Sequence, residues 1–511
     1  MTLDIPVTGR HHADERPASS MVITDPRDGS PVGELPSADV DEVRAAIDAA
    51  RAAFPAWRRT PAEERAQALR AAADALEERI DELAELEGRE TGRRRDDAVG
   101  GLRAAVSTLR QYAELGPLHR GLSLLGAADA TDFLRPEPRG VVAVITPWND
   151  PAAITAGLVG AALATGNTVV LKPSERCPHL GRRLGELLAC GLPDGVLSTV
   201  LGAAETGQAL VTSVDVDAVA HVGSSRTGEW IARAVALTGA HLIRENGGND
   251  ALLVDAGVDP AWAAAQIARG AFTNSGQLCT AVERVFLHRD VAAEVIAALV
   301  AEAEARNAAG PAPLVDERMR EQVHAHVLDA LASGARALVG GEVPGGPGSG
   351  YPATVLVDCT PDMLVFREET FGPVAPVMVV ESFAEGLALA ADDEHGLAAT
   401  VLTCDLAHAH AAIDALPVGT VKVNDVFGGA PGGSAQPRGR SGSGFGYGPE
   451  LLDELTTVKA VHLGAGAPRR GDASPDPGTP YDPGTPQNPD TPQDPDTPQD
   501  LGASHGEEAP R

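Results

Sequence analysis

From residue 139 onward, short β-branched runs alternate with alanine-rich stretches of helical periodicity. The series opens with GVVAVIT, AITAGLVGAALATG and NTVVLKP, and a helical stretch then runs to Cys190. It continues with VLSTVLG, DAVAHVG, RTGEWIARAVALTG and AHLIREN, and a second α/β series occupies residues 251 to about 425. Short apolar runs between helical segments are typical of strands in βαβ units. The alternation therefore predicts an α/β fold with parallel, doubly wound sheets.

The segments outside this alternation have other patterns. Alanine and leucine recur at helical intervals over 40–57 and 62–92, with Asp39 or Ser37 and Thr60 as candidate N-caps. Residues 475–498 hold four copies of a Pro/Asp hexad: PDPGTP, YDPGTP, QNPDTP and QDPDTP. Such sequence lacks core-forming side chains, which favours a disordered tail over a ligand for a proline-binding domain.

Composition excludes several classes of protein. A net charge of −31 argues against a nucleic-acid partner, and five cysteines without regular spacing indicate neither a disulfide framework nor a metal site. The polar N-terminus has no apolar export segment, and the weakly polar stretch 151–166 is too short for a membrane span. We interpret the chain of 511 residues as a cytoplasmic protein of two or three domains without a membrane partner.

One cysteine lies in an unusual setting. Cys279 ends the segment FTNSGQLCT, whose asparagine and glycine favour a loop that presents a side chain. A thiol of ordinary pKa is a few per cent thiolate at neutral pH, and that thiolate is a strong nucleophile. The window alone fits a buried, inert cysteine equally well.

Five further segments accompany it in order: ITPWNDP, VVLKPSE and IRENGGND before the cysteine, and EETFGPV and SGFG after it. With a spacing of 34 residues between Glu245 and Cys279 (279 − 245), the set resembles the aldehyde dehydrogenase superfamily over residues 22 to 462. The resemblance implies an NAD(P)-dependent enzyme of the hydrolytic type. Its fold would combine a Rossmann-type dinucleotide-binding domain, an α/β catalytic domain and a small oligomerisation element.

These expectations divide the chain as follows: a disordered arm at 1–20, a dinucleotide-binding domain at 21–244 with 120–139 in the oligomerisation element, a catalytic domain at 245–425, a return to the cofactor domain with an oligomerisation strand at 426–463, and a disordered tail at 464–511. The resemblance also implies a homodimer or homotetramer.

The residues expected to bind the dinucleotide come from several turns. Amides after the strand DAVAHV, with a serine hydroxyl, form an anion site at a helix N-terminus. An acidic residue at a strand end can accept from both ribose hydroxyls and repel a 2′-phosphate, which favours NAD over NADP. By resemblance, the cofactor-binding residues are Trp148, Lys172, Ser174, Glu175, Gly207, Gly223, Ser224, Glu369 and Phe371. Outside the resemblance, most would be ordinary turn or surface residues.

Aldehyde oxidation by cysteine requires a nucleophile, an oxyanion donor and a base that activates water. By resemblance, these are Cys279, Asn149 acting with the Cys279 backbone N–H, and Glu245. The products along this route are a thiohemiacetal, a thioester and a free acid. An acylating member that passes the acyl group to coenzyme A would not need Glu245, and a non-catalytic binding protein would need none of the three.

The chain departs from the family pattern at several positions. Asn246 and Asn249 replace the leucine and lysine of the usual E-L-G-G-K segment, and Asp150 replaces an aromatic residue of the substrate tunnel. Leu158 and Gly448 replace a lysine and a glutamate that commonly support proton movement around the base. The resemblance implies a small-molecule aldehyde as substrate, and Asp150 would favour a cationic aldehyde if it faced the tunnel. No arginine or lysine cluster suggests a carboxylate clamp.

Overall fold

The computed structural model describes residues 20–428, 434–464 and 466. The expected N-terminal arm before residue 20 and the Pro/Asp repeats lie outside these residues. Residues 20–124 and 132–461 form one compact unit, and the described residues 125–131, 462–464 and 466 belong to a second, much smaller one. The description below concerns the larger unit.

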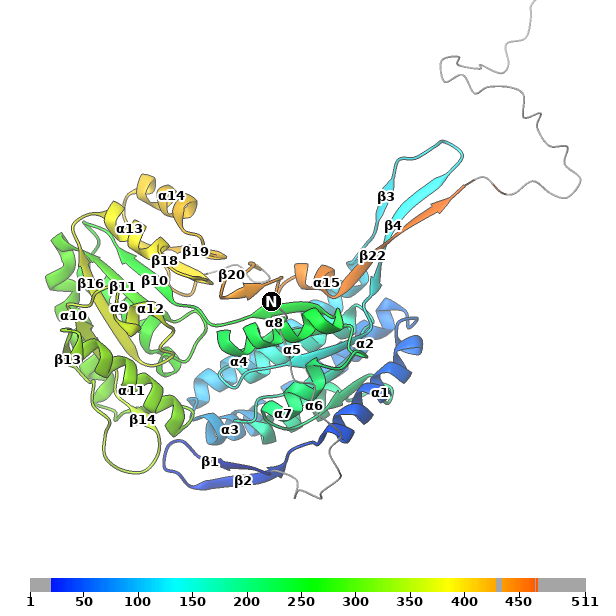
Figure 1. Cartoon of the computed structure of the whole chain (residues 1–511), viewed down its shortest axis with the longest axis horizontal. Coiled ribbons are helices and arrows are strands. Elements are labelled where there is room, and N and C mark those ends of the chain that lie inside the picture. The colour runs from blue at the N-terminus through cyan, green and yellow to red at the C-terminus, as the bar shows by residue number, and fades with distance from the viewer. Residues whose placement is uncertain (1–19, 429–433, 465, 467–511) are drawn as a thin grey trace, which may run out of the picture. The chain divides into compact units, whose positions relative to one another are not determined.

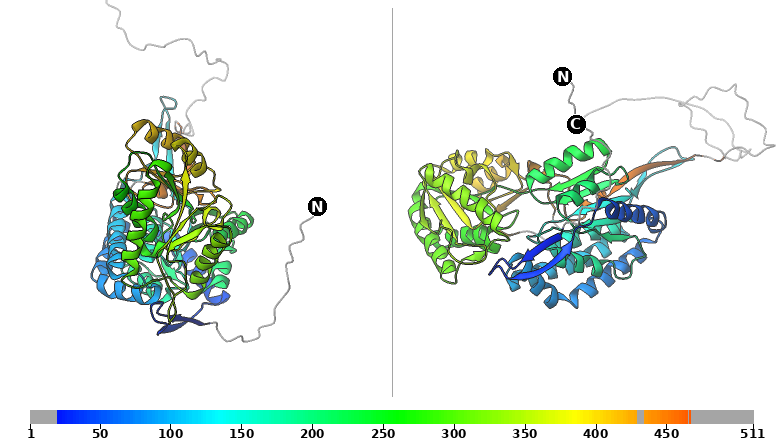
Figure 2. Two further views of the ribbon diagram at one scale, coloured as in Figure 1. Left: turned by 90° about the vertical axis from the view of Figure 1, so that its left-hand side faces the viewer. Right: turned by 60° about the horizontal axis from the view of Figure 1, so that its bottom comes forward.

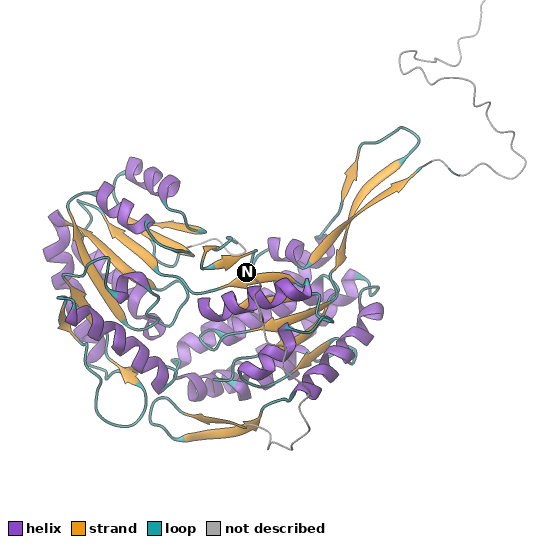
Figure 3. Cartoon of the chain, viewed as in Figure 1, coloured by secondary structure: helices purple, strands orange, loops and turns teal. Residues whose placement is uncertain are grey.

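A six-stranded sheet occupies the first part of this unit (Figures 1 and 3). Its strands are, in spatial order, β21 (Gly442–Ser443), β9 (His241–Glu245), β8 (Ala218–Val222), β5 (Val141–Ile145), β6 (Thr168–Lys172) and β7 (Leu197–Thr199). All neighbouring pairs are parallel except β21 with β9. Because the chain runs from β5 outward to β7 and then returns to β8 and β9, the strand order reverses beside β5. Such a reversal defines the ligand crevice of doubly wound sheets.

Helices cover both faces of this sheet. They are α1 (Val40–Trp57), α2 (Ala62–Glu77), α3 (Ile80–Thr91), α4 (Arg95–Leu118), α5 (Pro151–Ala164), α6 (Pro178–Leu188), α7 (Ala204–Val211) and α8 (Ser225–Thr238). The helices α2 to α6 pack on one face, whereas α1, α7 and α8 pack on the other. Strands β5, β6 and β8 are buried at every residue, which explains why their sequences are mostly apolar.

A seven-stranded sheet forms the second part. Its strands are, in spatial order, β13 (Arg336–Val339), β15 (Thr354–Val357), β16 (Val374–Val380), β11 (Val282–His288), β10 (Asp250–Val254), β18 (Ala398–Leu402) and β19 (Thr420–Val423). The helices of this part are α9 (Pro260–Phe272), α10 (Arg289–Asn307), α11 (Glu317–Ala332), α12 (Leu364–Arg367), α13 (Phe383–Ala391) and α14 (Leu406–Ala415). All pairs are parallel except β13 with β15. The doubly wound α/β fold predicted from the alternation is confirmed.

Smaller elements complete the unit. A hairpin of β1 (Ser20–Thr24) and β2 (Pro31–Pro36), dark blue in Figure 2, precedes α1. A three-stranded sheet joins β3 (Leu122–Leu124), β4 (Thr131–Pro138) and β22 (Thr456–Leu463), and α15 (Glu450–Glu454) precedes β22.

Two expectations about the N-terminal helices need correction, and one helix was missed. The single helix expected over 62–92 breaks between α2 and α3, because Arg79 leaves the helical region at φ −115° and the chain restarts with a new buried face around Leu83. Pro61, not Thr60, occupies the N-cap of α2, whereas Asp39 caps α1 in a capping box as expected. The 24-residue helix α4 was not anticipated at all.

Candidate active site

The segment that carries Cys279 is an irregular turn between α9 and β11. Asn274 and Ser275 adopt left-handed conformations with φ of 50° and 57°, and Gly276 follows with φ of 71°. A Cβ on Gly276 would lie 2.1 Å from the carbonyl oxygen of Gly372, so only glycine fits there. The expected loop is confirmed, and its backbone is strained in a way that is common at functional sites.

The surroundings of Cys279 hold its thiol in the neutral form. The residue is only partly exposed, and burial is the first cause of a pKa raised well above the ordinary thiol value. Negative charge from four carboxyl groups adds to this effect, from Glu245, Asp250, Glu369 and Asp150 in decreasing order. The thiolate fraction of Cys279 in the free protein is therefore smaller than that of a thiol of ordinary pKa.

Asn149 lies beside the cysteine segment. It follows β5 in the turn before α5, is 7% exposed, and donates from Nδ2 to the carbonyl oxygen of Gln277 over 3.1 Å. Asn274 donates in turn to the carbonyl oxygens of Asn149 and Gln277, each over 3.3 Å. Because a side-chain amide carries two hydrogens, Asn149 keeps a second N–H in addition to the one that holds it in place.

Glu245 is the last residue of β9. Its carboxylate makes no hydrogen bond or ion pair with any residue that the structure describes. Burial raises the pKa of Glu245 with no opposing partner, and one oxygen, Oε2, lies 2.6 Å from where a Cβ on Gly446 would be. An unpaired carboxyl of raised pKa beside a nucleophile is suited to exchange protons near neutral pH.

The segment Glu369–Phe371 contacts the turn that follows β9. Glu369 Oε1 accepts from the Gly248 backbone N–H over 3.2 Å, and burial raises the pKa of this carboxyl well above its usual range. Phe371, at φ 56°, meets Trp148 edge to face with ring centroids 5.7 Å apart. Two expected cofactor residues from distant parts of the chain are therefore in direct contact.

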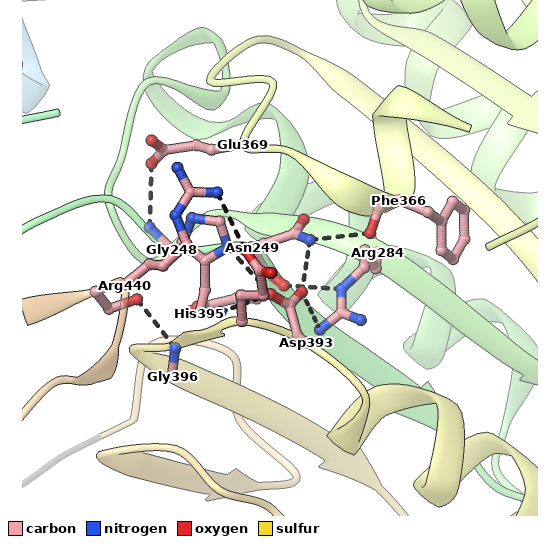
Figure 4. A network of polar contacts seen from close by, with 12 residues as sticks. Gly248, Asn249, Arg284, Phe366, Glu369, Asp393, His395, Gly396 and Arg440 are labelled. Atoms are coloured by element: carbon pink, nitrogen blue, oxygen red, sulfur yellow. Dashed lines mark hydrogen bonds and ion pairs between the residues drawn. The ribbon is translucent and has the colours of Figure 1, made fainter. Parts of the chain in front are cut away.

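Figure 4 shows the polar network behind this segment. Asn249 donates from Nδ2 to the carbonyl oxygen of Phe366 over 3.0 Å and to Asp393 Oδ2 over 2.6 Å. Arg284 donates to the carbonyl oxygen of Asn249 over 2.9 Å and pairs with Asp393 over 3.0 Å. The departure at position 249 therefore has a structural role, because Asn249 fixes the turn whose Gly248 binds Glu369.

The remaining expected cofactor residues lie at the carboxyl ends of the six-stranded sheet. Lys172 ends β6, is 5% exposed, and donates from Nζ to the carbonyl oxygen of Pro173 over 3.1 Å, with Glu175 3.8 Å away. Burial lowers the pKa of Lys172. Gly207 on α7 faces the lysine stem, since a Cβ there would lie 3.5 Å from its Cδ. Buried Ser174 accepts from the Arg176 backbone N–H over 3.2 Å.

The turn between β8 and α8 is a capped helix N-terminus. Gly223 donates its N–H to the carbonyl oxygen of Glu245 over 3.1 Å, which ties the turn to the end of β9. Ser224 is the N-cap of α8 and accepts from the Thr227 backbone N–H over 3.3 Å. Its hydroxyl oxygen therefore already stabilises the helix that was expected to bind an anion.

Four departures from the family pattern now have a structural setting. Asp150 pairs with Arg93 over 2.7 Å, which removes the free charge on which a preference for cationic aldehydes would depend. Asn246 is buried against Gly228 of α8 and donates to the carbonyl oxygen of Arg440 over 2.7 Å. Leu158 is part of the apolar core. Gly448, at φ 79°, has no room for a side chain beside Ser434.

Sequence reasoning missed several groups around the site. Glu283 on β11 is 3% exposed and accepts from the backbone N–H groups of Thr370 and Phe371 over 3.1 and 3.0 Å. Burial raises the pKa of Glu283 to about 8 and that of Asp250 to about 7. A carboxylate inside an apolar strand pattern such as AVERVFLH was the available signal.

Among the described residues, no helix combines the length and apolar character that a bilayer crossing requires.

Comparisons with known proteins agree with this geometry. The model of the aldehyde dehydrogenase family matches residues 12–461. The chain is 39% identical to an α-ketoglutarate semialdehyde dehydrogenase of Haloferax volcanii, over 75% of this chain and 82% of that protein. It is 35% identical to the NADP-dependent succinate-semialdehyde dehydrogenase GabD of Escherichia coli, over 86% of this chain and 94% of that one. It is 34% identical to an NAD-dependent benzaldehyde dehydrogenase of Pseudomonas putida, over 86% of this chain and 92% of that protein.

A solved structure of PnpE with nicotinamide adenine dinucleotide is similar at a TM-score of 0.84 and 32% identity, covering 88% of this chain and 95% of that one. The range matched by the family model, 12–461, includes both sheets and Cys279, Glu245 and Asn149. With a family model that spans most of its length and relatives above 30% identity, the chain belongs to the aldehyde dehydrogenase family.

Proposed function

We propose that this protein oxidises an aldehyde to a carboxylic acid with NAD, through a covalent intermediate on Cys279. The observation that carries the proposal is the meeting of three groups. Asn149 is hydrogen-bonded to the cysteine segment, and the unpaired Glu245 acts electrostatically on the same thiol. These are the donor, base and nucleophile that the reaction requires.

The side chains at the carboxyl ends of β5, β6 and β8 suit a dinucleotide. Gly207 lets the buried Lys172 lie close to α7, and the buried hydroxyl of Ser225 has no hydrogen-bond partner among the described residues. We assign Lys172, Ser174 and Glu175 to the adenosine side, with Gly207, Gly223 and Ser224 around the phosphates. Trp148, Glu369 and Phe371 are assigned to the nicotinamide side. When bound, the cofactor accepts the hydride.

The residues of the chain perform the remaining steps. Cys279 attacks the carbonyl carbon as thiolate, and the thiol proton leaves through a nearby base or water. The second N–H of Asn149 and the Cys279 backbone N–H donate to the developing oxyanion. After oxidation to the thioester, Glu245 takes a proton from water, which attacks the acyl carbon and releases the acid.

The domain and assembly assignments belong to the same proposal. We assign 21–244 to cofactor binding and 245–425 to catalysis, with 120–139 and 426–463 contributing to oligomerisation. The three-stranded sheet supports the last assignment, since Leu122 and Val458 are 64% and 63% exposed on it. Exposed apolar strands of this kind are suited to pairing with another copy of the chain, as a homodimer or homotetramer.

Substitution of the nucleophile tests the covalent route. Cys279→Ala should abolish NADH formation while leaving NAD affinity nearly intact, because the thiol contributes little to cofactor binding. Absorbance of NADH and a binding titration measure the two properties. More than a trace of turnover in Cys279→Ala would overturn the covalent mechanism.

Substitution of the base separates hydrolysis from acyl transfer to coenzyme A. Glu245→Gln should still form one equivalent of NADH per site and then turn over slowly, because only deacylation needs the base. Rapid mixing should show this burst in Glu245→Gln. If the variant instead kept full turnover when coenzyme A was supplied, the acylating alternative would replace the hydrolytic one.

A further inference from the structure

A single row of side chains crosses the middle of the six-stranded sheet at its carboxyl edge. Ile145 of β5 is in register with Lys172 of β6 on one side and with His221 of β8 on the other. Residues in register on parallel strands project from the same face. Val170 and Val219, two positions earlier on β6 and β8, belong to the core cluster under α1, α7 and α8, so the row faces these helices.

This row lies at the point where the strand order reverses. The chain leaves β5 toward β6 and β7, and returns on the other side of β5 to β8 and β9. Ligands of open α/β sheets bind outside the carboxyl ends of the strands at such a point. His221 is the penultimate residue of β8, two residues before Gly223.

The imidazole of His221 is buried against the turn between β8 and α8. The residue is 3% exposed, and neither Nδ1 nor Nε2 has a partner among the described residues. The ring lies against the Gly223 turn, since a Cβ on Gly223 would be 2.7 Å from Cε1 and 3.1 Å from Nε2. The hydroxyl of Ser225, in the first turn of α8, is also buried and unpartnered. Buried polar groups in folded proteins are normally hydrogen-bonded, so the two unpartnered side chains at this turn, His221 and Ser225, need an explanation.

The charge around His221 indicates what would satisfy it. Burial lowers the pKa of His221 to about 4, with the positive charges of Lys172 on β6 and Arg244 on β9 acting in the same direction and the backbone of Ser224 acting against them. The ring is therefore neutral at pH 7 and offers one N–H donor. Two cations and a free donor beside a helix N-terminus suit a phosphate oxygen.

We propose that His221 is a cofactor-binding residue that donates a hydrogen bond to the diphosphate of the dinucleotide at the turn between β8 and α8. This assignment rests on the proposed function, because it requires the crevice to hold NAD. His221 would be left without a partner in the free protein and would gain one on binding. The alternative role for His221 is packing in the core, without a contact to the cofactor.

Binding of ADP at pH 8 tests the assignment, because ADP carries the diphosphate without the nicotinamide. His221→Phe keeps a ring of similar size without a donor, whereas His221→Gln keeps an N–H donor. Hydrogen bonds to charged groups are among the stronger ones, so ADP should bind His221→Phe about tenfold more weakly than wild type. His221→Gln should recover part of this loss. Adenosine, which lacks the diphosphate, should bind all three proteins alike.

Thermal unfolding of the cofactor-free proteins provides the control for folding. His221→Phe removes an unsatisfied polar group, so its melting temperature should be no lower than that of wild type. Equal ADP affinity in wild type and His221→Phe would overturn the assignment, as would equal weakening of ADP and adenosine. If wild type bound neither ADP nor NAD, the cofactor assignment itself would fall, which distinguishes the two failures.

Discussion

The thiol of Cys279 is a nucleophile that the free protein holds in its unreactive form. Burial and the neighbouring carboxyl groups both oppose ionisation, and Glu245 contributes the largest charge effect. A positively charged nicotinamide beside these carboxyl groups would reverse part of the effect. The sequence motif therefore identifies the nucleophile, whereas its ionisation depends on side chains that are distant in sequence and that only the fold brings together.

Alkylation by iodoacetamide should report this electrostatic control. Glu245→Gln should raise the alkylation rate of Cys279 at pH 8 by about three- to tenfold in the free protein, because a lost negative charge lowers the thiol pKa, and one pKa unit is a tenfold change in thiolate. Glu394→Gln, at an exposed glutamate, serves as the control and should change nothing. A slower rate in Glu245→Gln would mean that Glu245 deprotonates Cys279 instead.

Cofactor preference should depend on Glu175. Its side chain is 42% exposed and lies 3.8 Å from the Lys172 ammonium, so solvent and this cation weaken its repulsion of a 2′-phosphate. We expect wild type to prefer NAD over NADP by roughly tenfold in kcat/KM, which corresponds to about 1.4 kcal/mol. Glu175→Gln should narrow the gap mainly by improving NADP use. A wild-type preference for NADP would contradict the assignment of this ribose pocket.

At the scale of elements, the buried strands and the helix α5 were predictable because their sequences are apolar throughout and bounded by turn residues. The break between α2 and α3 was not, since both helices and the residues between them keep helical composition. The polar network around Asn249 and Arg284 also escaped prediction, because hydrogen bonds between distant segments have no local sequence pattern. The spacing of the motifs predicted the candidate nucleophile, base and oxyanion donor, but not the residues that hydrogen-bond to them or surround them.

Gly276, in the turn before Cys279, has a matched control in Gly257, which lies between β10 and α9. Gly276 and Gly257 both have φ above 70°, but only Gly276 has neighbours that a Cβ would meet. Gly257→Ala should lower the free energy of unfolding by roughly 1–2 kcal/mol, the cost of a left-handed alanine. Gly276→Ala should lose more than this, together with most NADH formation. Equal losses of stability with intact activity would show that the close approach to Gly372 is unimportant.

At the scale of the whole molecule, buried carboxyl groups make stability depend on pH. Burial raises the pKa of Glu283 to about 8, and that of Asp250 and Glu87 to about 7. For Glu283, burial outweighs the two backbone N–H groups that favour its ionised form. Each group binds its proton more tightly in the folded protein than in the unfolded one. Its contribution to the free energy of unfolding is therefore fully present below its pKa in the unfolded chain, and is lost as the pH rises through its pKa in the folded protein.

The free protein should therefore become less stable between pH 5.5 and pH 8, by on the order of a few kcal/mol in total. Melting temperatures across this range measure the effect, and Glu283→Gln should flatten the curve. Glu137→Gln is the control. Ion pairing lowers the pKa of Glu137 to about 2, so the effect of Glu137 on stability changes with pH only below pH 4.5. A wild-type melting temperature that rises from pH 5.5 to pH 8 would contradict this account.

The pairing of β21 with β9 has a consequence for how the chain is made. Glu245 lies on β9, whose outer edge is covered by Gly442 and Ser443, nearly 200 residues later in synthesis (442 − 245 = 197). Asn246 likewise donates its backbone N–H to the carbonyl oxygen of Ser441 over 2.8 Å. Until these late residues leave the ribosome, the strand that carries the catalytic base is an open sheet edge, and such edges recruit other chains. The nascent protein is therefore most prone to aggregate while most of its fold is already in place, and chaperone demand should peak just before residues 441–443 emerge.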